Sequence, residues 1–102
     1  MKPQRVRLDG EMSIYRAAEL KETLLAPLAA GTLVELDLSA VSELDTAGVQ
    51  LLLLARQTAR GLGGDVCVLA SSAPVQDLLD LLGLADSFAH RHGAAALPGA
   101  MP

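Results

Sequence analysis

Apolar segments of strand length alternate with amphipathic helix patterns along the chain, and this alternation constrains the fold more than any other feature. Strand patterns lie at 6–8, 33–38 and 66–69, and a helix pattern follows each of them. Parallel strands need such crossover helices, because a tight turn cannot join them. The order predicts an α/β domain with a mostly parallel central sheet. With a further short strand at Met12, the sheet would contain about four to five strands.

Three helices are predicted from apolar residues that recur at spacings of three and four. The first is capped by Ser13 and ends by Gly31. The second covers about residues 46–62 and ends in glycines that suit a helix C-terminus. The third has Ser72 as its cap and a proline in its first turn, and Gly83 ends it. Their apolar stripes are Ala17, Leu20, Leu24 and Leu28, then Leu52, Ala55, Ala59 and Leu62, then Val75, Leu78, Leu79 and Leu82.

The length of 102 residues fits one domain and is too short for two separate cores. We expect the domain to occupy residues 1–92. From residue 93 to 102 the sequence consists mainly of Gly, Ala and Pro, which predicts a flexible C-terminal tail.

Charge and composition exclude several classes of protein. The formal net charge is −4 and the basic residues are scattered, which argues against a nucleic-acid partner. No apolar run approaches the roughly 20 residues of a membrane-spanning helix, and the first residues do not resemble a secretory signal. The one cysteine, Cys67, cannot form an intrachain disulfide. These features predict a cytoplasmic protein without direct membrane insertion.

No catalytic set is visible in the sequence. Cys67 lies in an apolar strand pattern without a basic neighbour, which predicts a buried and inert thiol. His90 and His92, with Asp86 nearby, could ligate a metal, but two histidines near a tail are more simply explained as solvent-exposed. We therefore expect no enzyme activity, no cofactor and no metal.

The segment Val41–Gly48 is the most informative part of the chain, because it joins the most apolar strand to the second helix. Asp45 or Thr46 can cap that helix, whose first amides are unpaired and carry partial positive charge. Phosphorylation of Thr46 would add about −1.5 to −2 charges beside Asp45, which would repel them. The simpler alternative is a capped turn in which Gly48 is small for packing. The residues alone leave both interpretations open.

The second helix has a polar face opposite its apolar stripe. Gln50, Gln57 and Gly61 lie on this face, and Leu53 and Leu54 flank it. Apolar residues beside an exposed face and a modifiable hydroxyl favour a docking surface. A leucine-rich helix that extends past its core stripe, or that packs on a second copy of the chain, would give the same pattern.

These motifs together resemble the STAS family across roughly Val6–Phe88. The resemblance rests on Leu36–Ser39, on Leu44–Gly48 and on the leucine-rich helix that follows. Gly10–Ile14 and a Ser-Ala-Pro-Val helix start before Leu-Leu-Gly-Leu support it. In the anti-sigma-factor antagonists of this family, an Asp-Ser-Ser/Thr-Gly loop carries the hydroxyl that a partner serine kinase phosphorylates.

The resemblance implies a non-enzymatic signalling module of STAS-type fold. Thr46 matches the phosphorylated position, and Asp45 and Gly48 match the flanking acid and glycine. Two departures are Thr46 in place of serine and Ala47 in place of the second hydroxyl. The resemblance implies a kinase-type anti-sigma factor as partner, and a homodimer is possible. The expected partner-binding residues are Asp45, Thr46, Ala47, Gly48, Gln50, Leu53, Leu54 and Gln57.

The Asp-Thr-Ala-Gly form of the loop is also similar to two other groups of STAS proteins. One is the STAS subunit of lipid-transport ABC complexes, which would contact a transporter ATPase. The other is the set of STAS proteins encoded beside chemotaxis kinases. These two groups give the alternative functions.

Overall fold

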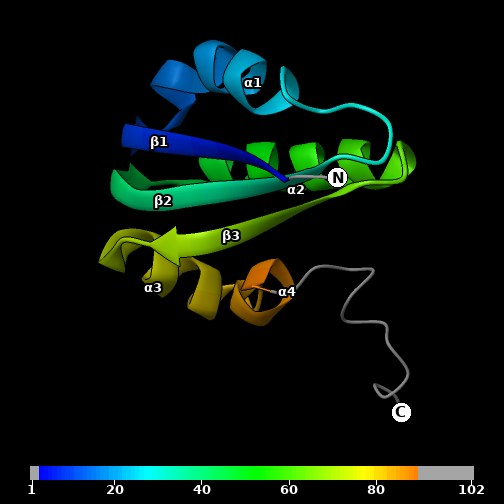
Figure 1. Cartoon of the computed structure of the whole chain (residues 1–102). Helices are drawn as coiled ribbons and strands as arrows, with labels where there is room; N and C mark the ends of the chain where they lie inside the picture. Colours follow the sequence, from blue (N-terminus) through cyan, green and yellow to red (C-terminus); the bar gives the residue numbers. More distant parts are fainter. Residues whose placement is uncertain (1–2, 90–102) are drawn as a thin grey trace.

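The computed structural model describes residues 3–89, in which strands and helices alternate (Figure 1). The strands are β1 (Gln4–Met12), β2 (Leu33–Leu44) and β3 (Asp65–Ser71). The helices are the short 3₁₀ helix η1 (Ile14–Arg16), α1 (Ala17–Leu25), α2 (Thr46–Gly61), α3 (Ala73–Leu81) and α4 (Ala85–Ala89).

The sheet is parallel, and its strand order is β1-β2-β3. The predicted α/β domain with a parallel sheet and crossover helices is confirmed. The predicted count of four to five strands is wrong, because residues 3–89 form a sheet of three strands. Met12 does not start a strand of its own. It is the last residue of β1, which stays paired to β2 through Gly10 by shifting its register.

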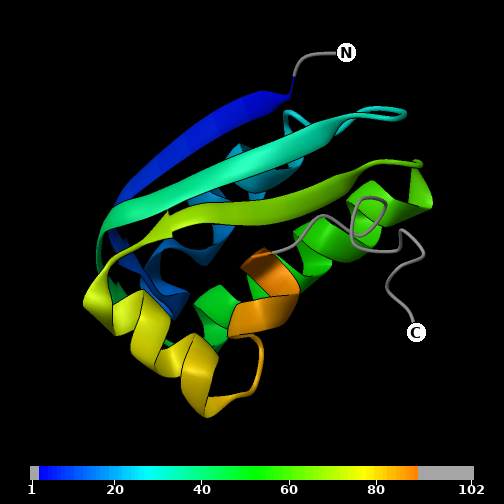
Figure 2. The ribbon, with the colours of Figure 1, turned by 60° about the horizontal axis from the view of Figure 1, so that its bottom comes forward.

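The helices lie on one face of the sheet, and the hydrophobic core fills the space between them (Figures 1 and 2). β2 is the central strand, and its core-facing residues Val34, Leu36 and Leu38 are almost fully buried. The alternation of side chains along a strand explains why every second residue enters the core. Helical residues of the same core are Leu20, Leu24, Leu52, Ala55, Ala59, Val75, Leu79 and Phe88.

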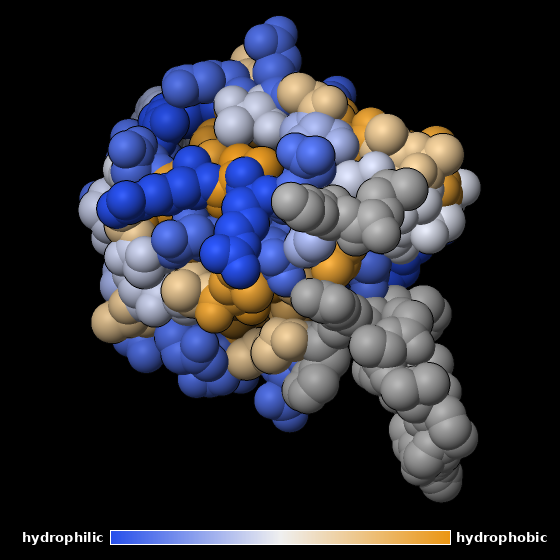
Figure 3. Space-filling view, in the orientation of Figure 1, coloured by the Kyte–Doolittle hydropathy of each residue, from blue (hydrophilic) through white to orange (hydrophobic). Residues whose placement is uncertain are grey.

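The other face of the sheet is more polar. Arg5 and Arg7 are exposed on β1, and Arg5 forms an ion pair with Glu35 of β2 at 3.2 Å. Seen from the side opposite α2, hydrophilic residues cover much of the strands, with apolar residues between them (Figure 3). Within the described residues, the helices and most of the apolar core therefore lie on the same side of the sheet.

The predicted apolar stripes are wrong at two helix ends. Leu62 is 43% exposed and Leu82 is 45% exposed, although both were expected in the core. Each residue is the C-cap that follows the last helical residue, so it no longer continues the buried stripe. The first helix is also shorter than expected. It begins as 3₁₀ turns, and α1 ends at Leu25, shortly before Pro27.

The sequence patterns did not predict α4, which is too short to show periodicity. Phe88 of this helix is nevertheless fully buried and belongs to the core. The predicted tail, residues 93–102, lies outside the described residues, as do His90 and His92.

Candidate functional site

Asp45 connects three parts of the fold at the N-terminal end of α2. It is the N-cap of that helix, and its Oδ1 accepts a hydrogen bond from the Gly48 amide at 3.0 Å. Its Oδ2 accepts one from the Ile14 amide at 3.1 Å, and its own amide donates to the Met12 carbonyl at 3.2 Å. Of the two possible caps, Asp45 is therefore the one that the chain uses.

The hydrogen bonds to Asp45 also fix its charge. The Gly48 amide, and to a lesser extent the Ile14 amide, lower the pKa of Asp45 below its ordinary value. Both bonds favour the ionised carboxylate, since they point N–H groups at it. Asp45 therefore places a fixed negative charge at the start of α2 at neutral pH.

Thr46 is the first residue of α2 and is exposed. Its hydroxyl makes no hydrogen bond to any other residue in the range 3–89. Because Asp45 serves as the cap, the Thr46 side chain has no structural task at the helix start. A hydroxyl in this position is accessible to another protein.

Gly48 brings the start of α2 against the end of β1. A Cβ atom at this position would lie 2.5 Å from the Met12 carbonyl oxygen and 2.6 Å from Leu44 Cδ1. Real Cβ atoms do not approach other atoms so closely. The small size predicted for Gly48 is therefore a packing requirement, and Gly48 is buried.

The remaining predicted contact residues lie along the outer side of α2. Thr46, Gln50, Leu53 and Gln57 are spaced by four, three and four residues, so they form one stripe on the helix. Gln50 and Gln57 are exposed and Leu53 is half-buried. Leu54, beside the stripe, is 37% exposed. The exposed members of the predicted set thus form one stripe, which begins beside Asp45 and follows α2, whereas Ala47 is half-buried and the buried Gly48 does not reach this surface.

The sequence analysis missed two large apolar residues beside this surface. Ile14 is 65% exposed and Tyr15 is 89% exposed, and both lie in η1. The hydrogen bond from the Ile14 amide to Asp45 places them next to the start of α2. Nothing in the sequence indicated that Ile14 and Tyr15 are exposed. A helix that begins after Ser13 would be expected to bury some of the residues in its first turn.

Arg56 was also missed, and it holds α4 against α2. Its guanidinium lies 4.0 Å from the centroid of the Phe88 ring, and it donates a hydrogen bond to the Ser87 hydroxyl. Leu53, Arg56, Gln57 and Arg60 line a shallow hollow on the outer side of α2. These contacts give Arg56 a structural role at the edge of the α2 surface.

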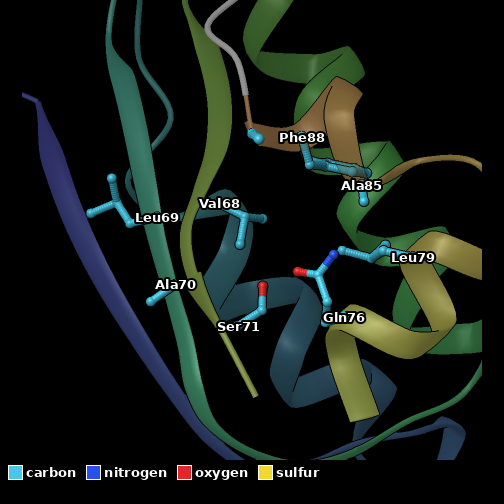
Figure 4. A pocket seen from close by; sticks show the side chains of 9 residues that line it. Val68, Leu69, Ala70, Ser71, Gln76, Leu79, Ala85 and Phe88 are labelled. Atoms are coloured by element: carbon cyan, nitrogen blue, oxygen red, sulfur yellow. The ribbon is translucent and has the colours of Figure 1, made fainter. Parts of the chain in front are cut away.

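A separate pocket lies between β3, α3 and α4, and its volume is about 150 Å³ (Figure 4). It is smaller than the roughly 300 Å³ at which small-molecule sites begin. Its polar side chains are Ser71 and Gln76, and neither is a strong acid or base. The pocket is distant in sequence from the Asp45–Gly48 loop, and its lining does not assemble a catalytic set.

Of the residues considered for chemistry, the structure describes Cys67 and Asp86. Cys67 is 3% exposed, so the predicted burial of its thiol is confirmed. Within residues 3–89, no three His, Cys, Asp or Glu side chains are grouped as metal ligands would be.

No helix in the described part of the chain combines the length and the apolar character needed to cross a bilayer.

The fold and the loop define a small α/β domain with an exposed threonine hydroxyl at the start of α2. Residues 1–92 match the family model described as "Mlab, STAS domain". The chain therefore belongs to the STAS domain family, as the sequence motifs predicted. No curated relative matches this sequence.

The fold is also similar to that of a solved structure, the anti-sigma factor antagonist SpoIIAA in its unphosphorylated form. The TM-score is 0.65, the sequence identity is 19%, and the match covers 100% of this chain and 95% of that chain. The predicted STAS-type fold is thereby confirmed. At this identity the likeness establishes the fold.

Proposed function

We propose that this protein is a non-enzymatic, cytoplasmic signalling module of the anti-sigma-factor antagonist type. It binds a partner kinase or anti-sigma factor through the N-terminal end of α2, and phosphorylation of Thr46 releases that partner. The observation that supports this proposal is the exposed Thr46 hydroxyl in the first turn of α2, beside an Asp45 that already serves as the cap.

Phosphate at Thr46 would change the surface more than the fold. The modification adds about −1.5 to −2 charges, and the helix N-terminus accepts part of this charge. Asp45 is ionised, and both of its oxygens hold backbone amides, so it cannot turn away without losing the cap. The phosphate and Asp45 together would form a strongly anionic group where the partner docks. Charge and bulk then disfavour docking.

The proposal is tested by incubating the protein with the kinase encoded beside its gene and with ATP. Intact mass spectrometry should show one added phosphate. Thr46→Ala should remove the phosphate, and Thr23→Ala should keep it, because Thr23 is also an exposed helical threonine. Thr46→Glu should weaken binding of the kinase. An unmodified wild-type mass, or equal affinity of wild type and Thr46→Glu, would contradict the switch.

A second candidate function is a constitutive subunit that contacts a transporter ATPase through the same loop and helix. Two observations favour it, namely Ala47 in place of a second hydroxyl and the Mlab description of the matching family model. In that case the ATPase should co-purify in a fixed ratio with wild type and with Thr46→Glu alike. A transporter operon around the gene would favour this function. A sigma-regulator or chemotaxis operon would favour the switch or a chemotaxis adaptor.

A further inference from the structure

Ile14 and Tyr15 form an apolar projection, here called the Ile14–Tyr15 knob, beside the start of α2. Their exposed fractions of 65% and 89% are high for large apolar side chains. Aromatic residues such as tyrosine are enriched among the residues that dominate binding energy at protein interfaces. A knob of this kind next to Thr46 is therefore a candidate anchor for a protein partner.

The backbone of the knob is held in place by its neighbours. The Ser13 hydroxyl accepts a hydrogen bond from the Tyr15 amide at 3.3 Å, and the Asp45 carboxylate accepts one from the Ile14 amide at 3.1 Å. Ser13 is itself buried. The exposure of the two side chains is therefore a feature of a fixed turn. A fixed turn loses little conformational entropy when a partner binds it.

Arg16 closes the turn from the other side. Its Nη1 donates to the carbonyl oxygens of Asp9 and Glu11, both at 2.8 Å, and its Nη2 lies 3.1 Å from the Glu19 carboxylate. The hydrogen bond and the charge of Glu19 raise the pKa of Arg16. Arg16, the cation that directly follows the knob in the sequence, is thus committed to contacts within the chain.

Carboxylates lie at the end of the sheet from which the knob follows. Glu11 and Glu43 are direct partners in the register of β1 and β2, at the end of the sheet where Asp45 follows. Glu43 is exposed, Glu11 is half-exposed, and Asp45 is held ionised. These ends of β1 and β2 lie side by side (Figure 1). An apolar knob that is bonded to Asp45 and follows a strand end carrying Glu11 and Glu43 is complementary to an apolar socket with a basic rim.

We propose that the Ile14–Tyr15 knob inserts into an apolar socket on the partner protein, and that Lys or Arg residues on the rim of that socket face Glu11, Glu43 and Asp45. This inference rests on the proposed function, since it describes the partner of the same surface. A second copy of the chain is a poor occupant, because a two-fold contact would bring the two sets of carboxylates together. The phosphate on Thr46 would then act on a contact that already depends on charge.

The first test identifies what contacts the knob in the native host. A photo-reactive benzoylphenylalanine is placed at position 15, at position 50 on α2, or at position 81 on α3, where Leu81 is 80% exposed. We expect positions 15 and 50 to cross-link to the same protein, with Lys or Arg next to the residue that position 15 reaches. Position 81 should not cross-link to that protein.

The outcomes separate the two proposals. A cross-link from position 50 without one from position 15 keeps the docking function and overturns the knob. Cross-links from neither position overturn both. A cross-link from position 15 to another copy of this chain overturns the basic-socket partner.

The second test measures the affinity of the cross-linked partner for purified variants. Tyr15→Ala should weaken binding by about tenfold or more, as expected for an anchor, and Leu81→Ala by less than about twofold. Both side chains are exposed, so neither variant should change the thermal unfolding midpoint. If Tyr15→Ala binds the partner as wild type does while Thr46→Glu does not, the proposed insertion of the knob is wrong and the proposed docking function stands.

Charge is tested separately with Glu43→Gln. The association rate should fall about threefold, and the affinity should depend less on salt between about 50 and 300 mM. Asp77→Gln, an exposed carboxylate on α3, is the matched control and should change neither quantity. A Glu43→Gln protein with the salt dependence of wild type would contradict the basic rim.

Discussion

The two ends of α2 are built in opposite ways. At the C-terminal end, the Gly64 amide donates to the Ala59 carbonyl at 2.9 Å, and the Gly31 amide donates to the Leu62 carbonyl at 2.8 Å. At the N-terminal end, the Asp45 side chain caps the first turn by accepting from the Gly48 amide, and Thr46 is left exposed. One end of the helix is closed by backbone packing. The other is packed against β1 at Gly48 but leaves the Thr46 side chain exposed, so changes at the closed end and changes of exposed side chains at the open end should affect different properties.

The largest loss of stability is expected for Gly64→Ala at the closed end. A Cβ atom there would lie 2.0 Å from the backbone oxygen of Thr32, which cannot move away without disturbing the start of β2. We expect the free energy of unfolding to fall by about 3 kcal/mol, the upper part of the range for overpacking. Gly61→Ala is the control, because its Cβ would meet nothing. Both variants are unfolded in urea, and equal stability of the two would contradict this account.

A smaller loss is expected for Asp45→Ala at the open end, because the variant removes the cap and the acceptor for the Ile14 amide. Asp45→Asn should retain part of the cap. The pKa of Asp45 is lowered in the folded state, so its ionisation contributes stability above the ordinary pKa of an aspartate. That contribution is lost as pH falls through the folded pKa. Thermal unfolding against pH should therefore be less acid-sensitive below about pH 4 in Asp45→Asn than in wild type.

A loss of about 1 kcal/mol in the free energy of unfolding is expected for Arg60→Ala, near the top of the range for partly exposed ion pairs. Arg60 lies 2.9 Å from the Asp65 carboxylate, whose side chain is 7% exposed, while the Arg60 side chain is 35% exposed. The pair links the last turn of α2 to the start of β3. Gln57→Ala, one turn earlier and exposed, should change stability less. Equal unfolding midpoints for the two variants would show that the pair adds nothing to the closed end.

The smallest effect on stability is expected for Thr46→Glu. Its side chain is exposed and the cap belongs to Asp45, so the free energy of unfolding should change by less than about 0.5 kcal/mol. Binding of the partner should nevertheless weaken, as proposed above. A variant that unfolded readily would show that the open end also carries stability, and the contrast between the two ends would then disappear.

Much of this contrast was predictable from the sequence. The glycines after residue 60 indicated the end of α2, and the Asp-Thr-Ala-Gly segment indicated its start, because turn and cap chemistry is local. The order of strand and helix patterns also indicated the parallel sheet. Local chemistry could not show that Met12 continues β1, because that depends on which residues of β2 lie opposite.

The candidate site was predictable only in part. Asp45, Thr46, Gln50 and Gln57 were found because they are close in sequence and share the start or one face of a helix. Ile14 and Tyr15 were missed because they join this surface through a hydrogen bond between residues 31 positions apart. Arg56 was missed for the same reason, since its partner Phe88 lies in a helix without a recognisable pattern.

The strand order has a consequence for how copies of this domain meet. Within residues 3–89, β1 pairs with β2 alone and is therefore an edge strand. The backbone N–H and C=O groups on its outer side could pair with a strand of another molecule. This edge strand carries a charged side chain at every second position, namely Arg5, Arg7 and Asp9. Charged side chains on an edge strand oppose edge-to-edge pairing of sheets and the fibrous aggregates to which such pairing can lead. The domain can therefore leave the edge of β1 unpaired without aggregating through it at high protein concentration.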